Sequence, residues 1–170
     1  FDLSYSKLFD ADMGKLYPVV HDEMVPGDTF EIGNELVIRF NPLLAPVLHE
    51  INVYIHYFFV PYRLLDENWE EFITGGEDGQ SNISLPKVLG TIVKGSIGDL
   101  IGLPLVNFSG DVQNRPLSYP YYAYNLIYNE YYRDENLQAE VNLGQGNLLY
   151  RNWEKDYFTS CLPWQQRGIA

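Results

Sequence analysis

Adjacent carboxylates are the feature of this sequence that comes nearest to a catalytic pattern. They occur as Asp22-Glu23, Glu70-Glu71 and Asp134-Glu135. A glycosidase needs two carboxylates on opposite sides of a cleft, one acting as general acid and the other as base or nucleophile. These pairs fall on turns or on the polar faces of expected helices, where carboxylates are usually solvated. The sequence therefore predicts no enzyme, and glycoside hydrolysis stands as a third alternative behind two binding or structural functions.

Two stretches partly match known ligand-binding loops, but each lacks a residue that the chemistry needs. Asp10, Asp12 and Gly14 have the spacing of the start of a calcium loop, yet His21 occupies the position of the bidentate glutamate. Residues 90–96 are similar to a phosphate-binding P-loop, but their lysine precedes the second glycine instead of following it. Neither a calcium site nor a phosphate site is predicted.

Histidine and cysteine, the usual ligands of zinc, are sparse. His21, His49 and His56 lack the spacing of a zinc site, and the single cysteine, Cys161, has no catalytic signature around it. One cysteine also excludes an internal disulfide. We therefore predict no metal and no cofactor, and we expect Cys161 to pack as a small apolar side chain.

Tyrosines recur between residues 119 and 133, where aromatic rings could stack on the bases of a single strand. The spacing of three or four residues instead places them on one face of a helix. Arg133 is the only basic residue of the segment. A protein surface is therefore the expected partner, and the candidates for subunit contact, with a core position as the other reading, are Tyr121, Tyr124, Tyr128 and Tyr131.

Strand signals fill residues 16–60, and the clearest strand is residues 51–60. Strict alternation places every second side chain of this run on one face, and its predicted core residues are Val53, Ile55, Tyr57 and Phe59. The opposite face is half apolar, so we expect both faces to be covered. Pro61 ends the strand because it lacks an N–H group.

Helical signals follow Pro61. Leu65, Trp69 and Phe72 have helical spacing, with Asp66 as the expected N-cap, and Trp69 and Phe72 should anchor this acidic helix. Short helices are predicted at residues 86–93 and after the capping-box spacing of residues 96–99. The longest is predicted from residues 118–120 to about 133, and a short strand is possible at residues 148–150. Strands thus come first and helices second, without βαβ alternation.

Length and charge limit the classes of protein to which this chain can belong. A chain of 170 residues, 15% of them aromatic, can bury the core of one domain. Its formal net charge of -12 gives no basic footprint for direct binding to nucleic acid, and no apolar run is long enough for a membrane span. The first residue is Phe1, not methionine, so we expect further residues upstream.

Seven phrases, taken in order, resemble the N-terminal part of the major capsid protein of microviruses, the gokushovirus-like phages with small single-stranded DNA genomes. Six are residues 26–30, 56–65, 68–72, 98–104, 123–134 and 156–164, and the seventh is Arg39 with Pro42 and Pro46. The sequence departs from the resemblance at Cys161, where a small residue such as alanine is expected. It is also much shorter than the proteins of this family.

The resemblance implies a mainly β fold, a viral jelly-roll sandwich with long loop and helical insertions. Residues 1–170 would be the N-terminal portion of one such domain, with the early strands in about 1–63 and inserted helices and loops in about 64–170. It also implies a structural, non-enzymatic protein, sixty copies of which form a T=1 icosahedral shell around single-stranded DNA.

The same resemblance implies several partners and a location. The partners are other copies, the C-terminal remainder of the protein, a small basic DNA-binding virion protein and, indirectly, the packaged DNA, with no membrane. The location is the virion, assembled in the cytoplasm of a bacterial host. The alternative function is a carbohydrate-binding or receptor-binding β-sandwich module, since jelly rolls also occur in lectins.

Overall fold

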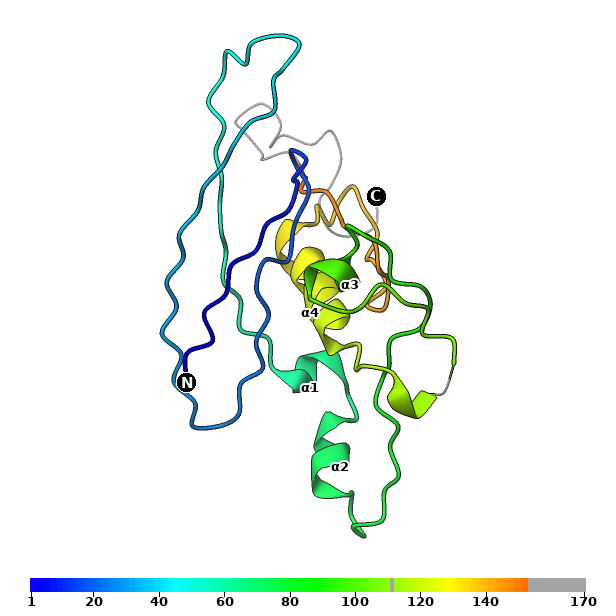
Figure 1. Cartoon of the computed structure of the whole chain (residues 1–170). Coiled ribbons are helices and arrows are strands. Elements are labelled where there is room, and N and C mark those ends of the chain that lie inside the picture. The colour runs from blue at the N-terminus through cyan, green and yellow to red at the C-terminus, as the bar shows by residue number, and fades with distance from the viewer. Residues whose placement is uncertain (111, 153–170) are drawn as a thin grey trace. The chain divides into compact units, whose positions relative to one another are not determined.

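Short helices are the regular elements of the computed structural model, which describes residues 1–110 and 112–152 (Figure 1). In chain order they are α1 (Tyr62–Leu65), α2 (Trp69–Thr74), α3 (Ile97–Leu100), the 3-10 turn η1 (Val112–Asn114), α4 (Tyr119–Ile127) and the π-helix η2 (Tyr128–Tyr132). The chain divides into two compact units. One contains residues 1–21 with those from 60 onward, and the other contains residues 22–59.

The expected mainly β jelly roll is wrong for this structure. Over the described ranges no sheet forms, and strand pairing is limited to three isolated antiparallel bridges, Lys15–Tyr150, Lys87–Leu117 and Thr91–Asn107. Residues 51–60, the clearest predicted strand, carry no bridge to any described residue. The physical reason is that alternation sets only the direction of side chains, whereas a strand also needs a second segment to meet its N–H and C=O groups.

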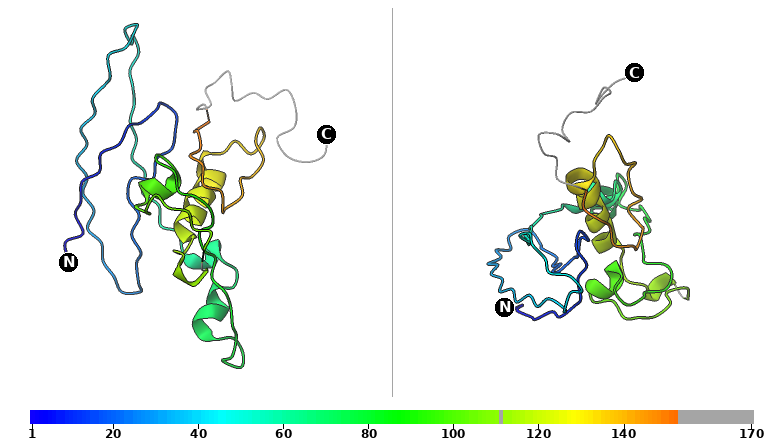
Figure 2. Two further views of the ribbon diagram at one scale, coloured as in Figure 1. Left: turned by 45° about the vertical axis from the view of Figure 1, so that its right-hand side comes forward. Right: turned by 90° about the horizontal axis from the view of Figure 1, so that it is seen from above.

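The unit of residues 22–59 is one long excursion of the chain, which runs out, bends at residues 44–45 and returns (Figure 2). The two legs meet through side chains, since the Tyr57 hydroxyl donates to Asn34 Oδ1 at 2.9 Å. A tight turn begins the excursion, with the Asp28 N–H bonded to the Val25 carbonyl at 3.1 Å. Gly27 has φ +98°, which only glycine adopts easily.

Residues 1–21 of the first unit form a hairpin held by side chains. The Tyr5 hydroxyl donates to the Val19 carbonyl at 3.3 Å, and the rings of Phe9 and Tyr17 lie 5.4 Å apart. The ammonium group of Lys7 donates to the carbonyls of Pro18 and Val19 on the second leg and to that of Leu100 at the end of α3. One half-buried cation thus ties the hairpin to a helix terminus, where positive charge is favourable.

The second leg of that hairpin also pairs with a segment far along the chain. Leu16 N–H donates to the Leu149 carbonyl at 2.9 Å, and Arg151 N–H donates to the Gly14 carbonyl at 2.7 Å. The hydroxyl of Tyr124 bridges the two segments, donating to the Leu16 carbonyl and accepting from the Leu149 N–H, both at 2.9 Å. Helix α4 therefore holds together two segments that are far apart in the sequence, at Leu16 and at Leu149, through one side chain.

The core of this unit lies between α3, α4 and the loops before α3. Its buried cluster consists of Val88, Ile92, Ile97 and Tyr121, with Leu103, Phe108 and Leu148 among the side chains packed against it. Pro120 near the start of α4 suits the first turn, where no N–H partner is required. Tyr121 of α4 belongs to this cluster, and Tyr122 and Tyr124 pack against it.

The helical predictions fare unevenly. The longest predicted helix is confirmed as α4 continuing into η2, which ends at Tyr132. The helix predicted after Pro61 is split into α1 and α2, and Asp66 is the C-cap of α1 instead of an N-cap. The helix predicted at residues 86–93 is wrong, since Gly90 has φ +100° and the segment carries two of the bridges.

Candidate functional site

The residues with the most reactive side chains are not gathered into one site. No group of three or more histidine, cysteine, aspartate or glutamate side chains that could hold a metal ion occurs in the part of the chain that the structure describes. Glu70 and Glu71 are exposed on α2, and Asp22 and Glu23 are exposed in the other unit. The predicted carboxylate pairs therefore lie open to solvent at these positions, as expected for solvated charges.

The histidines lie within or at the boundary of the 22–59 excursion, and all three are exposed. His56 lies between two aromatic rings, 6.0 Å from Tyr54 and 6.2 Å from Phe58 between centroids. His49 lines an apolar pocket. Cys161 and the phrase at residues 156–164 lie outside the described residues.

Aromatic rings hold α1, α2 and the start of α4 together. Tyr62 stacks on Trp69 at 4.4 Å and 20°, and Tyr119 meets both rings edge-on at 4.9 and 5.6 Å. The Tyr119 hydroxyl donates to Asp66 Oδ2 at 2.9 Å. Burial, followed by the bond to Asp66, raises the pKa of Tyr119 above its ordinary value. Trp69 is thus anchored on Tyr62 and Tyr119, although the role of Trp69 and Phe72 as core residues of the complete protein stays a prediction.

Two buried asparagines of α4 and η2 fix the segment at residues 141–147. Asn125 is fully buried (0% exposed), and its amide nitrogen reaches the carbonyls of Tyr121, Leu143 and Gln145 at 2.7–2.9 Å. Asn129 pairs with Val141 twice, as donor to its carbonyl and as acceptor from its N–H, both at 2.9 Å. Sequence reasoning missed both residues, because asparagine in a helix has no pattern that distinguishes a buried clamp from a solvated side chain.

The four tyrosines proposed for subunit contact divide by exposure. Tyr121 and Tyr128 are buried within the chain, and Tyr124 is half-buried with its hydroxyl paired. Tyr131 is exposed and lies edge-on to Tyr132 at 4.9 Å. Of the four, Tyr131 therefore offers the most ring surface to another chain, and contact by the set stays a prediction.

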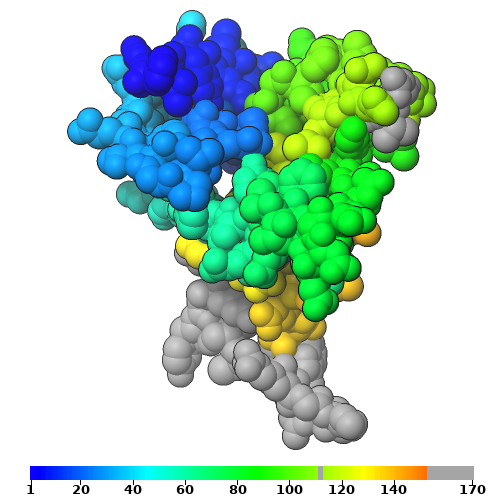
Figure 3. Space-filling view, turned by 90° about the horizontal axis from the view of Figure 1, so that it is seen from below, coloured from blue at the N-terminus to red at the C-terminus, as the bar shows by residue number. Residues whose placement is uncertain are grey.

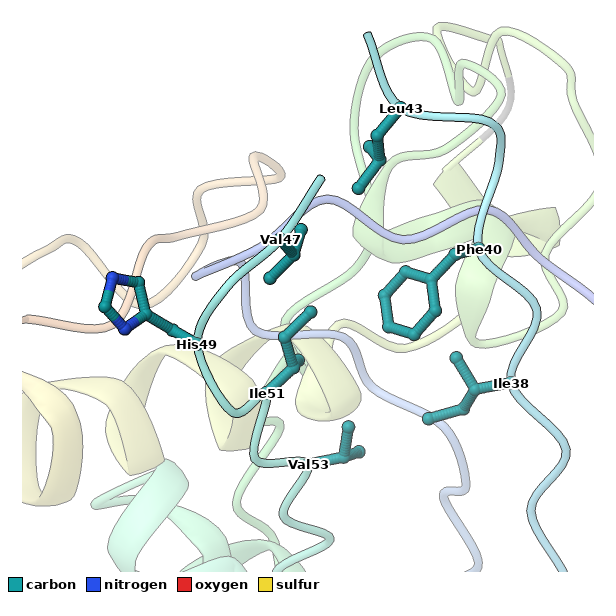
Figure 4. Close-up of a pocket in the computed structure, with 7 residues that line it drawn as sticks. All are labelled: Ile38, Phe40, Leu43, Val47, His49, Ile51 and Val53. Carbon is teal, nitrogen blue, oxygen red and sulfur yellow. The ribbon is translucent and has the colours of Figure 1, made fainter. Parts of the chain in front are cut away.

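An apolar pocket lies between the two legs of the 22–59 excursion (Figure 4). His49 is among its lining residues, but its ring points away from the others; the side chains that point into the space between the legs are Ile38, Phe40, Leu43, Val47, Ile51 and Val53. Of the predicted core residues, Ile55 is half-buried, whereas Val53, Tyr57 and Phe59 are exposed in the described chain. Their burial in the complete protein is not tested by this structure and stays a prediction.

Exposed apolar side chains are therefore the dominant functional feature of the described residues, and they occur on both legs of the excursion and, separately, on α2 of the other unit. Contiguous apolar patches on a protein surface typically mark contact with other chains. The described geometry defines a protein whose surfaces are suited to association. Comparison with known proteins also indicates a protein that associates with other chains, and it identifies the family to which the chain belongs.

The chain belongs to the capsid protein family described as Capsid protein (F protein), whose family model matches residues 1–170. It is 36% identical over 205 aligned positions to capsid protein VP1 of Chlamydia phage 1, covering 99% of this chain and 33% of that protein. It is 35% identical over 186 positions to capsid protein VP1 of Bdellovibrio phage phiMH2K, covering 100% of this chain and 34% of that protein. The predicted resemblance to microvirus capsid proteins is confirmed.

A third relative, capsid protein VP1 of Spiroplasma virus 4, is 25% identical over 185 positions, with 92% of this chain and 32% of that protein covered. The chain thus spans about a third of the length of the curated relatives that it matches. The activity and partners of a complete protein are therefore matters for proposal.

Proposed function

We propose that this chain is part of the structural protein of a phage capsid, which associates with other copies of itself to form the shell. The observation that carries the proposal is the family match over all 170 residues. Membership of a capsid family supports a structural role over an enzymatic one. Self-association of many copies is the ordinary route to a closed shell.

The surface chemistry supports the same function. Apolar side chains are exposed on both legs of the 22–59 excursion, and buried aromatic and asparagine contacts fix the helices of the other unit. Interfaces between subunits need such a combination of apolar surface and fixed backbone. The described residues contain no helix long and apolar enough to cross a membrane.

The finer features of the proposal come from the family resemblance. They are a T=1 shell of sixty copies, packaged single-stranded DNA, a small basic virion protein, contact with the C-terminal remainder of the protein, and assembly in the bacterial cytoplasm. The net charge of -12 supports a separate basic partner, because this segment alone cannot neutralise phosphate.

Electron microscopy of the complete capsid polypeptide that carries this chain, expressed in bacteria, tests the proposal. Closed particles of uniform diameter with icosahedral symmetry are the expected result. A matched sample in which Tyr121 is replaced by Ala should yield few particles, since that ring lies in the buried cluster. A wild-type polypeptide that stays a monomer at every concentration would contradict the function.

A further inference from the structure

Helix α2 presents an apolar face that the described side chains cover only at Trp69. Trp69, Phe72 and Ile73 occupy one side of the helix at i, i+3 and i+4. Trp69 packs on Tyr62 and Tyr119, but Phe72 and Ile73 are 41% and 62% exposed, and α2 contains no buried residue. Seen from the end that carries α2, the atoms of this part of the chain lie uncovered (Figure 3).

Strong negative charge surrounds this face. Residues 66–78 contain six acidic side chains and no lysine or arginine. Glu70 lies beside Ile73 on the helix surface, and its carboxylate makes no hydrogen bond or ion pair with the described residues. A partner for α2 must therefore combine apolar contact with positive charge.

The chain itself carries a surface of that chemistry, on the paired segments before and after α3. Ile92 N–H donates to the Val106 carbonyl at 3.0 Å, and Phe108 N–H donates to the Gly90 carbonyl at 2.8 Å. Val93 directly follows the buried Ile92 on one of these segments, and Leu105 directly precedes Val106 on the other. Val93 and Leu105 are 59% and 53% exposed.

Positive charge accompanies these apolar side chains. Residues 79–98 contain two lysines and no acidic residue, and the carboxylate of Asp99, which follows them, accepts the Gly95 N–H at 2.7 Å. Lys94 directly follows Val93, is exposed, and makes no hydrogen bond or ion pair with the described residues. This surface, Val93, Lys94 and Leu105, is complementary to the face of Glu70, Phe72 and Ile73 in both polarity and charge.

We propose that α2 of one copy docks on the surface of Val93, Lys94 and Leu105 of the next copy, with Glu70 paired to Lys94. The proposal rests on the proposed capsid function and adds to it the residues of one contact. Two different patches meet, so the contact is heterologous. Repetition of a heterologous contact closes into a ring when its rotation divides a full turn.

Charge reversal in the complete polypeptide tests the contact, with sedimentation velocity to measure self-association and electron microscopy to count particles. E70K and K94E should each raise the concentration needed for association by about tenfold, since each places like charges together. The double variant E70K/K94E restores an opposite pair and should return association to the wild-type level. Both positions are exposed, so unfolding temperatures should stay at the wild-type value.

A second double variant separates the pair from net charge. E31K/K94E has the same net charge as the wild type but leaves Lys94 replaced, since Glu31 is an exposed residue of the other unit. It should associate as poorly as K94E alone.

The outcomes distinguish this contact from the proposed function. Rescue by E70K/K94E and not by E31K/K94E supports the contact. Equal behaviour of the two double variants would overturn it. Weaker association in E70K together with unchanged association in K94E would also overturn it, because that result would assign α2 to a different basic partner. Wild-type polypeptide that associates without forming closed particles would count against the capsid function while the rescue still tests the contact.

Discussion

Gly98 shows how one atom decides packing at the centre of the first unit. A Cβ atom at this position would lie 2.9 Å from Ile92 and would collide with the Tyr121 hydroxyl. Gly98 lies inside α3, where alanine is ordinarily the better helix former by about 1 kcal/mol. Helix propensity and packing therefore make opposite demands, and the short contacts decide in favour of glycine.

Gly98→Ala should therefore lower the free energy of unfolding of the complete polypeptide by about 1–3 kcal/mol, the usual cost of overpacking. Gly110→Ala is the control, because no atom lies within 4 Å of the added Cβ and no positive φ is imposed there. Chemical denaturation measures both. Equal stability of the two variants would show that the core yields at Gly98.

Tyr124 links stability to alkaline pH. Burial chiefly raises the pKa of this phenol to about 12, while the Leu149 N–H that it accepts opposes the rise. Because the folded pKa exceeds the ordinary value of 10, the neutral hydroxyl stabilises the fold fully below pH 10. That stability should be lost as pH rises from 10 to 12.

Unfolding free energies measured between pH 8 and 12 should therefore decline less steeply for Tyr124→Phe than for the wild type. Phenylalanine keeps the ring but cannot titrate. Tyr131→Phe is a suitable control, since it removes a hydroxyl from an exposed ring. Identical pH profiles for wild type and Tyr124→Phe would contradict the expected role of burial.

Buried asparagines hold α4 and η2 in place as much as their aromatic side chains do. Asn125→Ala would remove the side-chain donor to the carbonyls of Leu143 and Gln145 and one of the two acceptors of the Gln145 side-chain amide. Each buried group left unsatisfied costs about 1–3 kcal/mol.

We expect Asn125→Ala to destabilise the complete polypeptide by about 2–4 kcal/mol and to speed hydrogen exchange at Val141, whose N–H bonds to the nearby Asn129. Asn52→Ala, at an exposed position, should change stability by less than about 0.5 kcal/mol. Thermal unfolding and exchange mass spectrometry provide the measurements. Unchanged exchange at Val141 would mean that the loop does not depend on Asn125.

The sequence predicts elements whose cause is local and fails where the cause is distant. Helix α4 is predictable from Pro120 and the tyrosine spacing, whereas the π-helical turn that follows it is not. Residues 86–93 have apolar spacing that suits a helix, but their structure is decided by pairing with residues some 16 to 30 positions later, the Thr91–Asn107 and Lys87–Leu117 bridges. The predicted sheet fails for the same reason, since alternation carries no information about which segment will pair.

The candidate surfaces show the same limit of the sequence. Tyrosine spacing indicates a shared helix face but does not tell which part of that face the chain's own loops cover, so Tyr121 and Tyr128 turn out to be buried. The proposed surface of Val93 and Leu105 has no signal in the sequence, because the segments that carry these residues come together only when residues 90–92 and 106–108 pair.

For the whole molecule, exposed apolar surface predicts that residues 1–170 expressed alone will associate. Both legs of the 22–59 excursion expose large apolar side chains, which include Leu36, Val37, Ile38, Phe40, Leu44 and Leu48. Such surface favours self-association in water. Co-expression with the rest of the complete polypeptide should raise the soluble yield.

Light scattering and thermal unfolding of the isolated segment measure this outcome. We expect polydisperse assemblies without a single cooperative transition. Replacement of the exposed Leu44 and Leu48 by Ser should reduce the scattering. A compact monomer that melts in one transition would show that the segment is a self-sufficient domain.

The pairing of Lys15 with Tyr150 imposes a delay on the folding of the first unit during synthesis. A ribosome that has just made Lys15 must add 135 further residues before its partner exists, the difference between the two positions. At about 5–20 residues per second this takes on the order of 10 s. During that interval Tyr124, which bridges the two segments, is also absent for most of the delay. The hairpin of residues 1–21 is therefore made well before the segment that fixes it, and it is among the last parts of the unit to reach its place.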